Sequence, residues 1–413
     1  MITREDNDRL TRVEGDAPLG RMLGENYWIP FARCEGLEAG APPQRIRLLG
    51  KSLVAFRGED GRVGIVDEHC PHRRVSLSLA RVEGCSLRCI YHGWRIDASG
   101  AVVEVPSEGE RSAGFAARVR TNRYQAREAG GLVWAFLGQG EAPVLPALPF
   151  MSVPAESRWW SRMIVKCNWL QGFEGALDSV HLNWLHQGWN DPDRTKGHEA
   201  LRIASPRYEI DVTDYGLRTA AIRDLGADGV HFRVAEFVAP FYALSASRQP
   251  AVPTDCSVFI SVPMDDENHM LFFGFWDEVG PLQDVSAFFS EDLNRDDMFS
   301  DADTTLPGWG QDRGAMSQGH FSGFTKSVLH EDLGVQMSMG PIVDRSLEHV
   351  CGTDLAIVQT RRYLLDMIRD FEAGRPVDRG LDAYRARRAV PFSCVATPGV
   401  DWRQDGMRKP VAA

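Results

Sequence analysis

Two short runs of the chain combine cysteine and histidine in a pattern that suits an iron–sulfur cluster. The first reads Cys70-Pro-His72 and the second, after sixteen intervening residues, reads Cys89-Ile-Tyr-His92. Each run supplies one sulfur and one nitrogen, so two thiolates can hold one iron of a [2Fe–2S] cluster while two imidazoles hold the other. Neutral histidine in place of thiolate raises the reduction potential. The spacing therefore predicts an electron-transfer centre.

A cluster with this mixed ligation is a Rieske centre, and the main alternative is a structural zinc ion. Zinc sites usually pair cysteine with cysteine and histidine with histidine, whereas each run here mixes the two types. A chance occurrence is disfavoured because both pairs lie in one short segment flanked by turn-type residues. Cys85 is close enough to be a rival ligand, but no histidine follows it at the matching distance.

A second group of possible metal ligands reads Asp178-Ser-Val-His181-Leu-Asn-Trp-Leu-His186. Non-haem Fe(II) sites that activate O₂ use two histidines and one carboxylate. In a regular helix over 168–187 the two rings would point roughly 140° apart, so their convergence on one metal requires a distortion, and we predict a π-bulge. Asp178 lies on the same face as His181, where it can ligate the metal or orient the histidine.

The elements that must position these residues indicate two domains of different type. Residues 1–25 read as a polar N-terminal arm, 26–141 as short strands and turns of a small all-β domain, 142–167 as a Pro-rich linker and entry segment, and 168–413 as a catalytic α+β domain. In the last region, strands are predicted near 207–212, 217–223, 230–238, 256–262 and 268–276, and a helix over 354–373.

Composition narrows the class of protein further. The chain has 413 residues, a formal net charge of −11 and 43% hydrophobic residues, which favours a globular enzyme over a nucleic-acid-binding protein. No apolar stretch is long enough for a membrane helix, and the N-terminus lacks the apolar core of a signal peptide. We therefore expect a cytoplasmic protein whose cysteines are metal ligands or buried thiols.

With these motifs in place, the chain resembles the Rieske non-haem iron ring-hydroxylating oxygenases, specifically the large (alpha) subunit of the phthalate dioxygenase-like branch. The resemblance covers nearly the whole length, and its most specific segments are 70–94, 168–181 and 330–348. It implies a Rieske domain followed by a catalytic domain of the helix-grip type, with an antiparallel sheet packed by helices.

The resemblance also assigns roles to residues. It implies that Cys70, His72, Cys89 and His92 hold the [2Fe–2S] cluster, and that His181, His186 and Asp332 hold a mononuclear Fe(II). Met337 stands where a glutamate is usual, and Glu331 is a second candidate for the third ligand. Asp178 matches a bridging aspartate that joins His181 to the cluster histidine, here His92, of a neighbouring subunit. A head-to-tail homotrimer, possibly stacked to a hexamer, is implied.

The implied reaction uses O₂ and electrons to hydroxylate an aromatic substrate, in the catabolism of aromatic compounds. No G-x-G-x-x-G motif lies between a strand and a helix, so electrons are expected from a separate NAD(P)H-dependent flavin/iron–sulfur reductase and are expected to pass from the cluster through Asp178 to Fe(II). The expected substrate is carboxylated and similar to phthalate, isophthalate or phenoxybenzoate. Arg223 is the first candidate for its carboxylate, with Arg218 and Arg207 as alternatives.

Three other functions fit parts of the pattern. An O-demethylase, which is a monooxygenase of methoxylated aromatic acids, would share the whole architecture. A Rieske electron-transfer protein without oxygenase activity would need only the first metal site. A zinc-stabilised binding module would need neither iron site.

Overall fold

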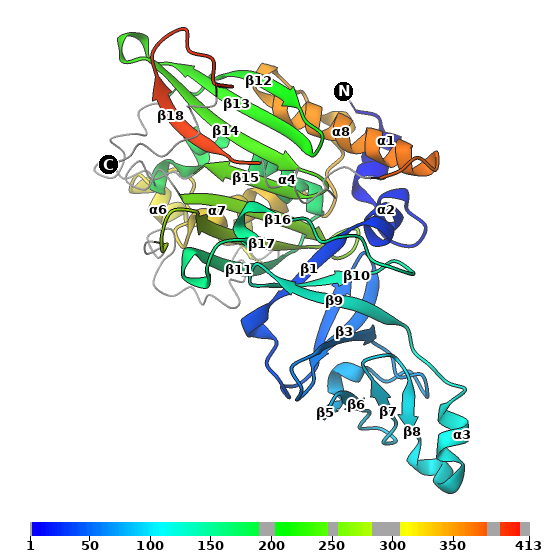
Figure 1. Ribbon diagram of the computed structural model, residues 1–413. Helices are drawn as coiled ribbons and strands as arrows, with labels where there is room; N and C mark the ends of the chain where they lie inside the picture. The colour runs from blue at the N-terminus through cyan, green and yellow to red at the C-terminus, as the bar shows by residue number, and fades with distance from the viewer. Residues whose placement is uncertain (1, 190–202, 247–254, 283–305, 378–388, 405–413) are drawn as a thin grey trace. The chain divides into compact units, whose positions relative to one another are not determined.

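The computed structural model describes residues 2–189, 203–246, 255–282, 306–377 and 389–404, and the chain divides into two compact units. One unit is Val13–Pro143, and the other combines Met1–Arg12 with Val144–Ala413. Figure 1 shows strands in both units, while most of the helices belong to the second.

The first unit contains two antiparallel sheets. The six-stranded sheet has the order β1-β10-β9-β4-β3-β2, and the four-stranded sheet has the order β5-β6-β7-β8. The strands are β1 (Trp28–Arg33), β2 (Gln44–Leu48), β3 (Lys51–Arg57), β4 (Val63–Asp67), β5 (Arg81–Glu83), β6 (Ser86–Arg88), β7 (Arg95–Asp97), β8 (Val102–Glu104), β9 (Arg123–Ala129) and β10 (Leu132–Phe136), with helices α2 (Pro18–Asn26) and α3 (Ser112–Ala116). The predicted all-β character is confirmed.

The second unit is built on one large antiparallel sheet. Its order is β11-β17-β16-β15-β14-β13-β12, and β18 pairs with the first half of β14. The strands are β11 (Arg158–Val165), β12 (Arg207–Val212), β13 (Gly216–Asp224), β14 (Val230–Val238), β15 (Tyr242–Ala246), β16 (Asp255–Pro263), β17 (His269–Asp277) and β18 (Phe392–Ala396). The predicted antiparallel sheet is therefore present, and all five predicted strands belong to it.

Six helices of the described residues belong to this unit. They are α1 (Arg4–Thr11), α4 (Trp169–Leu177), α5 (His181–Trp184), α6 (Arg313–Ser317), α7 (Val328–Ser338) and α8 (Leu355–Glu372). Helix α7 packs Leu329, Leu333 and Met337 against apolar side chains of β11 and β17. Helix α8 matches the helix predicted over 354–373, and its buried residues recur at helical spacing.

The structure divides the chain at places other than the predicted boundaries. Helix α1 belongs with the second unit because Trp169 Nε1 donates to the Leu10 carbonyl at 3.1 Å and Asn168 Nδ2 donates to the Thr11 carbonyl at 2.9 Å. The segment predicted as a linker and entry to the catalytic domain, 142–167, contains β11, which pairs with β17 along its whole length. Strands β11, β15 and β18 were not predicted.

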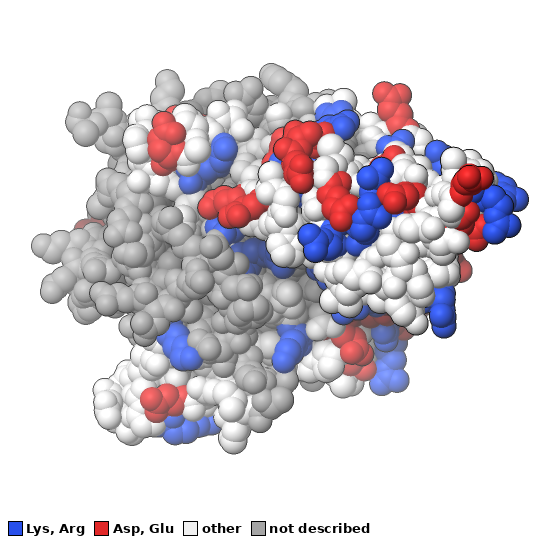
Figure 2. Space-filling model, turned by 90° about the horizontal axis from the view of Figure 1, so that it is seen from below, with Lys and Arg blue, Asp and Glu red and all other residues white. Residues whose placement is uncertain are grey.

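On one face of the molecule, charges of both signs are intermixed. On the face drawn in Figure 2, acidic and basic side chains of the described residues lie beside one another. Many such charges form pairs within one unit, as Arg88 does with Glu83 and Glu104. Across the described segments, no helix is both long enough and apolar enough to span a membrane.

Candidate iron-binding sites and the adjoining cavity

The two cysteine–histidine runs form loops with the same backbone pattern. The Cys70 N–H donates to the Val75 carbonyl and the Cys89 N–H donates to the Trp94 carbonyl, both at 2.9 Å. The fourth residue after each cysteine donates back to the cysteine carbonyl, and this residue has positive φ in both loops, 63° at Arg74 and 75° at Gly93. The two loops are therefore held in one conformation by backbone hydrogen bonds.

These loops bring like ligands together. The buried thiols of Cys70 and Cys89 interact with each other, and the rings of His72 and His92 have centroids 4.5 Å apart. Burial is the first cause that raises the pKa of Cys70, to about 11, so a bound metal must favour the thiolate. Nδ1 of His92 is buried without a hydrogen-bond partner among the described residues. Cysteine facing cysteine and histidine facing histidine fits a [2Fe–2S] cluster.

The second candidate site begins where a helix is interrupted. Helix α4 ends at Leu177, and Asp178 has extended backbone angles (φ −76°, ψ 133°). The Asp178 carboxylate accepts hydrogen bonds from the N–H groups of Val180 and His181 at 2.8 and 3.0 Å, so a side chain replaces the helical partners and a new helix, α5, starts at His181. The predicted π-bulge is wrong: a break after α4, followed by a 3-10 segment around His186, supplies the required distortion.

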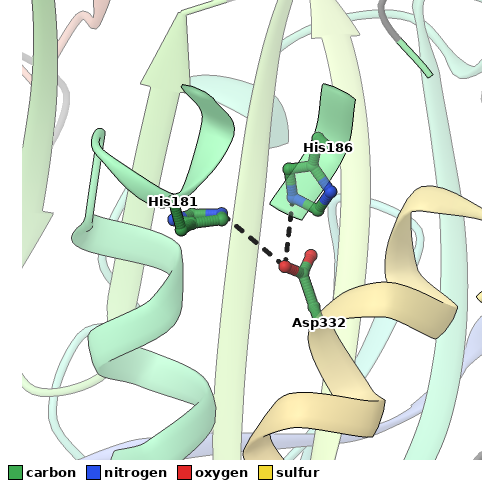
Figure 3. A group of neighbouring side chains, drawn as sticks. All are labelled: His181, His186 and Asp332. Atoms are coloured by element: carbon green, nitrogen blue, oxygen red, sulfur yellow. Dashed lines mark ion pairs between the residues drawn. The ribbon is translucent and has the colours of Figure 1, made fainter. Parts of the chain in front are cut away.

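This break brings three possible ligands to one point. Side-chain atoms of His181, His186 and Asp332 all lie within 4.8 Å of one another. Oδ1 of Asp332, on α7, lies 3.6 Å from Nε2 of His181 and 3.1 Å from Nε2 of His186. Figure 3 shows both rings directed toward this carboxylate. Two imidazoles and one carboxylate are the ligand set of a non-haem Fe(II) site, so the residues present fit the metal.

A carboxylate orients each histidine through its other ring nitrogen. Nδ1 of His181 lies 3.2 Å from Oδ2 of Asp178, and Nδ1 of His186 lies 2.5 Å from Oε2 of Glu331. Such contacts fix the tautomer and leave Nε2 available to a metal. The other oxygen of Glu331 accepts from the Ser322 hydroxyl at 2.5 Å. Glu331 therefore contacts His186 from the Nδ1 side, while Asp332 faces the Nε2 atoms of both histidines.

The charge state of Asp178 suits it to orient His181. Burial acts to raise its pKa, but the hydrogen bond and charge of His181 and two backbone N–H groups act more strongly together, so the pKa is lowered. The carboxylate is therefore ionised at neutral pH and can accept a hydrogen bond from the Nδ1–H of His181.

The structure places Arg223 behind the histidine segment and not in the cavity lining. Its Nη2 donates to the Ser179 carbonyl at 3.1 Å and to Oδ1 of Asn183 at 3.2 Å, and its Nε donates to the Ile203 carbonyl at 3.1 Å. The side chain is fully buried. Nη1 is buried and has no hydrogen-bond partner among the described residues. Arg223 thus braces the break and helix α5, and because it does not line the cavity we do not assign it to the substrate.

The two alternative arginines also lie outside the cavity lining. Arg218 pairs with buried Glu236, with Nε to Oε1 at 3.1 Å, and stacks over Trp402. Arg207 is exposed and pairs with Glu209. Both arginines therefore serve contacts at the β12–β13 side of the sheet.

A cavity adjoins the metal ligands, and a different arginine lines it. Its walls come from α4, α7 and the sheet strands β14 to β17, and they include Asp178, His181 and Asp332. Arg233 of β14 lines the cavity and donates from Nη2 to the Ser245 hydroxyl at 2.7 Å. The sequence analysis missed Arg233. Strand alternation divides 230–238 into two faces, but it does not show which face meets the cavity, so the strand itself carries no signal that singles out Arg233.

Comparison with known proteins now adds to this geometry. The Rieske [2Fe–2S] domain matches residues 27–123, and the family described as LigXa C-terminal domain like matches residues 136–412. The phthalate 4,5-dioxygenase oxygenase subunit of Pseudomonas putida is 37% identical over 98% of this chain and 94% of its own length. This chain belongs to the Rieske oxygenase large subunits. Its cofactors are a Rieske [2Fe–2S] cluster and a mononuclear iron.

Two further relatives resemble this Rieske oxygenase over most of their length. The 3-chlorobenzoate-3,4-dioxygenase oxygenase subunit of Comamonas testosteroni is 35% identical, with 97% of each chain covered. The 5,5'-dehydrodivanillate O-demethylase oxygenase subunit of a Sphingobium species is 31% identical over 92% of this chain and 82% of that protein. This Rieske oxygenase is accordingly an oxidoreductase that acts with a separate electron-transfer partner.

A solved structure shows the same fold. A variant oxygenase in complex with the ferredoxin of carbazole 1,9a-dioxygenase aligns with a TM-score of 0.59 at 19% identity, covering 88% of this Rieske oxygenase and 95% of that chain. The match supports the division into a Rieske domain and a catalytic domain with an antiparallel sheet.

Proposed function

We propose that this Rieske oxygenase uses O₂ to hydroxylate an aromatic carboxylic acid that is held in the cavity by Arg233. In this proposal Cys70, His72, Cys89 and His92 hold the cluster, and His181, His186 and Asp332 hold the mononuclear iron. The observation that carries the proposal is a buried arginine in the lining of the cavity that the iron ligands also line.

The walls of the cavity suit such a substrate. Arg233, Ser245 and Ser257 line it from three neighbouring strands, with Ser245 paired to Ser257 across β15 and β16. A guanidinium in a site of low dielectric binds a carboxylate through charge-assisted hydrogen bonds. Beside this polar row, Phe259, Phe273 and Phe275 line the cavity and can pack against an aromatic ring.

The names of the relatives point in the same direction. Two of them are named for phthalate and 3-chlorobenzoate, which are aromatic carboxylates. A third, 31% identical over about half of this chain, is named for phenoxybenzoate. These proteins support an aromatic acid as the substrate class, and the arginine in the cavity gives that class a physical reason.

The protein's own groups orient and protect the reacting centre. When bound, the cluster supplies electrons and the mononuclear iron supplies O₂ activation. Asp178 and Glu331 hold the two histidines in one tautomer, Ser322 holds Glu331, and the apolar wall excludes water from the substrate. Arg233 fixes the carboxylate, which determines the part of the ring that faces the ligands of the iron.

Electron delivery in this proposal joins two copies of the chain. Asp178 of one copy contacts His92 of the next in a homotrimer, possibly stacked to a hexamer, and an NAD(P)H-dependent flavin/iron–sulfur reductase reduces the cluster. Side chains around the cluster loops support such docking, because Leu79, Ile90 and Tyr91 are apolar and more than half exposed. Asp178 keeps a partly exposed carboxylate, 28% by side-chain area, while it holds His181.

O-demethylation of a methoxylated aromatic acid is the second candidate function. The similarity to the dehydrodivanillate O-demethylase subunit supports it, and the same cavity would bind such a substrate. Electron transfer without oxygenase activity is disfavoured because His181, His186 and Asp332 converge on one point.

A substrate screen with product identification tests the proposal. Reduced holoenzyme is mixed with O₂ and with benzoate, phthalate, isophthalate, 3-phenoxybenzoate or vanillate, and each product is identified by mass spectrometry. We expect a hydroxylated or demethylated product from an aromatic acid, with no product from the corresponding amide. In Arg233→Met the KM for the acid rises by about ten- to a hundredfold. Equal turnover of acids and amides contradicts the proposal.

A further inference from the structure

A second polar group lines the cavity, and neither the iron nor Arg233 accounts for it. Gln336 lies on α7 one helical turn after Asp332, so both side chains face the same way. It lines the cavity together with Gly172 and Gly175 of α4. The side chain is 6% exposed, and its Oε1 has no hydrogen-bond partner among the described residues. A buried amide oxygen without a donor is costly and needs an explanation.

A buried histidine stands beside this amide. Nδ1 of His269 lies 2.8 Å from the Cys167 carbonyl, so the proton is on Nδ1 and the lone pair is on Nε2. Burial lowers the pKa of His269 to about 4, which keeps the ring neutral. A Cβ on Gly172 would lie 2.5 Å from this Nε2 and 3.4 Å from Oε1 of Gln336. Glycine at this position therefore lets two unsatisfied acceptors approach the same part of α4.

A third unsatisfied group lies on the adjacent strand. Ser261 of β16 is fully buried, and its hydroxyl has no hydrogen-bond partner among the described residues. It pairs across the sheet with Leu271, which lines the cavity, and it is one pair of same-face residues away from His269. Buried polar atoms without partners therefore occur, among the described residues, on α7, on β17 and, one same-face pair away, on β16.

This place lies at the end of the cavity away from Arg233. Ser257, in the row of Arg233, pairs with Phe275, whereas His269 is six residues earlier on the same strand. Six residues of strand span roughly 20 Å. The guanidinium of Arg233 and the amide of Gln336 are closer together than this backbone distance if both side chains reach toward the middle of the cavity. No Lys or Arg lines the cavity at the His269 end among the described residues, so the end suits a neutral polar group better than a second carboxylate.

We propose that Gln336, with His269 and Ser261 as further polar groups at this end, is a specificity-determining residue that accepts a hydrogen bond from a hydroxyl or amino group on the substrate, remote from the carboxylate. The substrate class is then an aromatic acid with a neutral donor at its far end. This inference rests on the aromatic acid substrate proposed above. Because a substrate that fills the cavity displaces water from the buried acceptors, a substrate without the donor leaves them unpaired and is rejected.

The test is a competition within one turnover. Reduced holoenzyme receives O₂ and an equimolar pair of acids that differ only in a remote hydroxyl: benzoate with 4-hydroxybenzoate, or biphenyl-4-carboxylate with 4'-hydroxybiphenyl-4-carboxylate. The product ratio, measured by mass spectrometry, gives the preference directly. Acids of two lengths are used because the strand spacing sets only an upper limit on the distance between Arg233 and the polar groups at the Gln336 end of the cavity.

We expect the wild-type enzyme to prefer the hydroxylated member of at least one pair. In Gln336→Leu this preference falls by about tenfold, and in Ser261→Ala by about two- to threefold, consistent with the loss of neutral hydrogen bonds. Ser261→Ala removes one atom and guards against a folding defect in the larger change. Gln318→Leu, which alters an exposed glutamine of the same unit, should keep the wild-type ratio.

Two results overturn the inference. If the wild-type enzyme shows no preference, or if Gln336→Leu keeps it, the polar end only holds water and Gln336 does not select the substrate. Equilibrium binding of the four acids, followed by perturbation of the mononuclear site, separates this failure from that of the proposed function. If none of the four acids binds, the aromatic acid proposal fails and this inference fails with it.

Discussion

The two iron-binding regions differ in what holds their ligands. In the cluster loops, backbone hydrogen bonds repeat in both halves and fix Cys70 and Cys89 within a segment of twenty-three residues, 70–92. In the mononuclear site, the ligands come from 181–186 and from Asp332 on α7, and carboxylate side chains orient them. The first region is self-contained, whereas the second depends on distant side chains.

This difference predicts different sensitivity to mutation. A loop held by backbone bonds tolerates changes in its surroundings but fails when a ligand is lost. A site held by Asp178, Glu331 and Arg223 weakens in steps as each support is removed.

Loss of a cluster ligand should give the largest effect. Cys89→Ser removes one of two thiolates, and we expect complete loss of the Rieske electron paramagnetic resonance signal and of turnover. Iron binding at His181, His186 and Asp332 should persist, because no described side chain of 70–92 belongs to that ligand group. Iron analysis after purification checks this. A retained Rieske signal would contradict the assignment of Cys89.

Removal of a support in the mononuclear site should weaken iron without abolishing it. Glu331→Gln takes the charge from the partner of His186 Nδ1, and we expect iron affinity to fall by about ten- to a hundredfold. Titration of the metal-depleted site with Fe(II) measures this. Glu267→Gln, at an exposed position, should leave the affinity unchanged, and an equal loss in both variants would contradict a specific role for Glu331.

Variants of the two buried arginines should have different effects, because Arg223 supports the iron site and Arg233 is proposed to bind the substrate. Arg223→Met removes hydrogen bonds to the Ser179 carbonyl and to Asn183, so we expect lower iron affinity together with lower kcat. Arg233→Met should instead raise KM for the aromatic acid while the iron affinity stays near that of the wild type. Fe(II) titration and steady-state kinetics on both variants provide the check. The reverse pattern would restore Arg223 as the substrate residue.

The smallest expected effect is a pH dependence of stability that comes from His269. Its folded-state pKa, lowered by burial to about 4, lies below the ordinary value near 6.5, so the unfolded chain binds more protons and stability is lost as the pH falls from 7 toward 4. Between pH 7 and 5 this amounts to about 2 kcal/mol.

Comparison with a variant isolates the contribution of His269 to the pH dependence of stability. His269→Gln cannot be protonated but can still donate to the Cys167 carbonyl. Urea unfolding of both proteins at pH 7 and pH 5 should show about 2 kcal/mol more loss in the wild type. Parallel losses would mean that His269 is not buried as a neutral ring.

The same difference between the two sites explains which of their ligands could be predicted from the sequence. The cluster loops could be predicted because all four ligands lie close together and their type and order are specific. Spacing alone indicated His181 and His186, but Asp332 lies about 150 residues away and required the family resemblance. The π-bulge was a wrong prediction because side-chain capping by Asp178, which ends α4, competes with the helix and is hard to see in the sequence.

The arginines and the missed strands show a second limit. Arg223 and Arg233 lie on neighbouring strands and on the same face of the sheet. The sequence does not say which of them meets the cavity until the sheet and the helices are assembled. The long strands β13, β14, β16 and β17 were found because their apolar runs are bounded by turns. Strand β15 has five residues after a proline, and β11 follows a Pro-rich run, so both were hidden by local signals of irregular structure.

The central claim is that two independent iron centres cooperate in one oxygenation. The most direct measurement is a single turnover of reduced wild-type enzyme and of His186→Gln with an aromatic acid and O₂, with the product and the Rieske signal recorded together. We predict hydroxylated or demethylated product from the wild type, and from His186→Gln an intact Rieske signal with no product. Product from His186→Gln, or loss of its Rieske signal, would contradict the account.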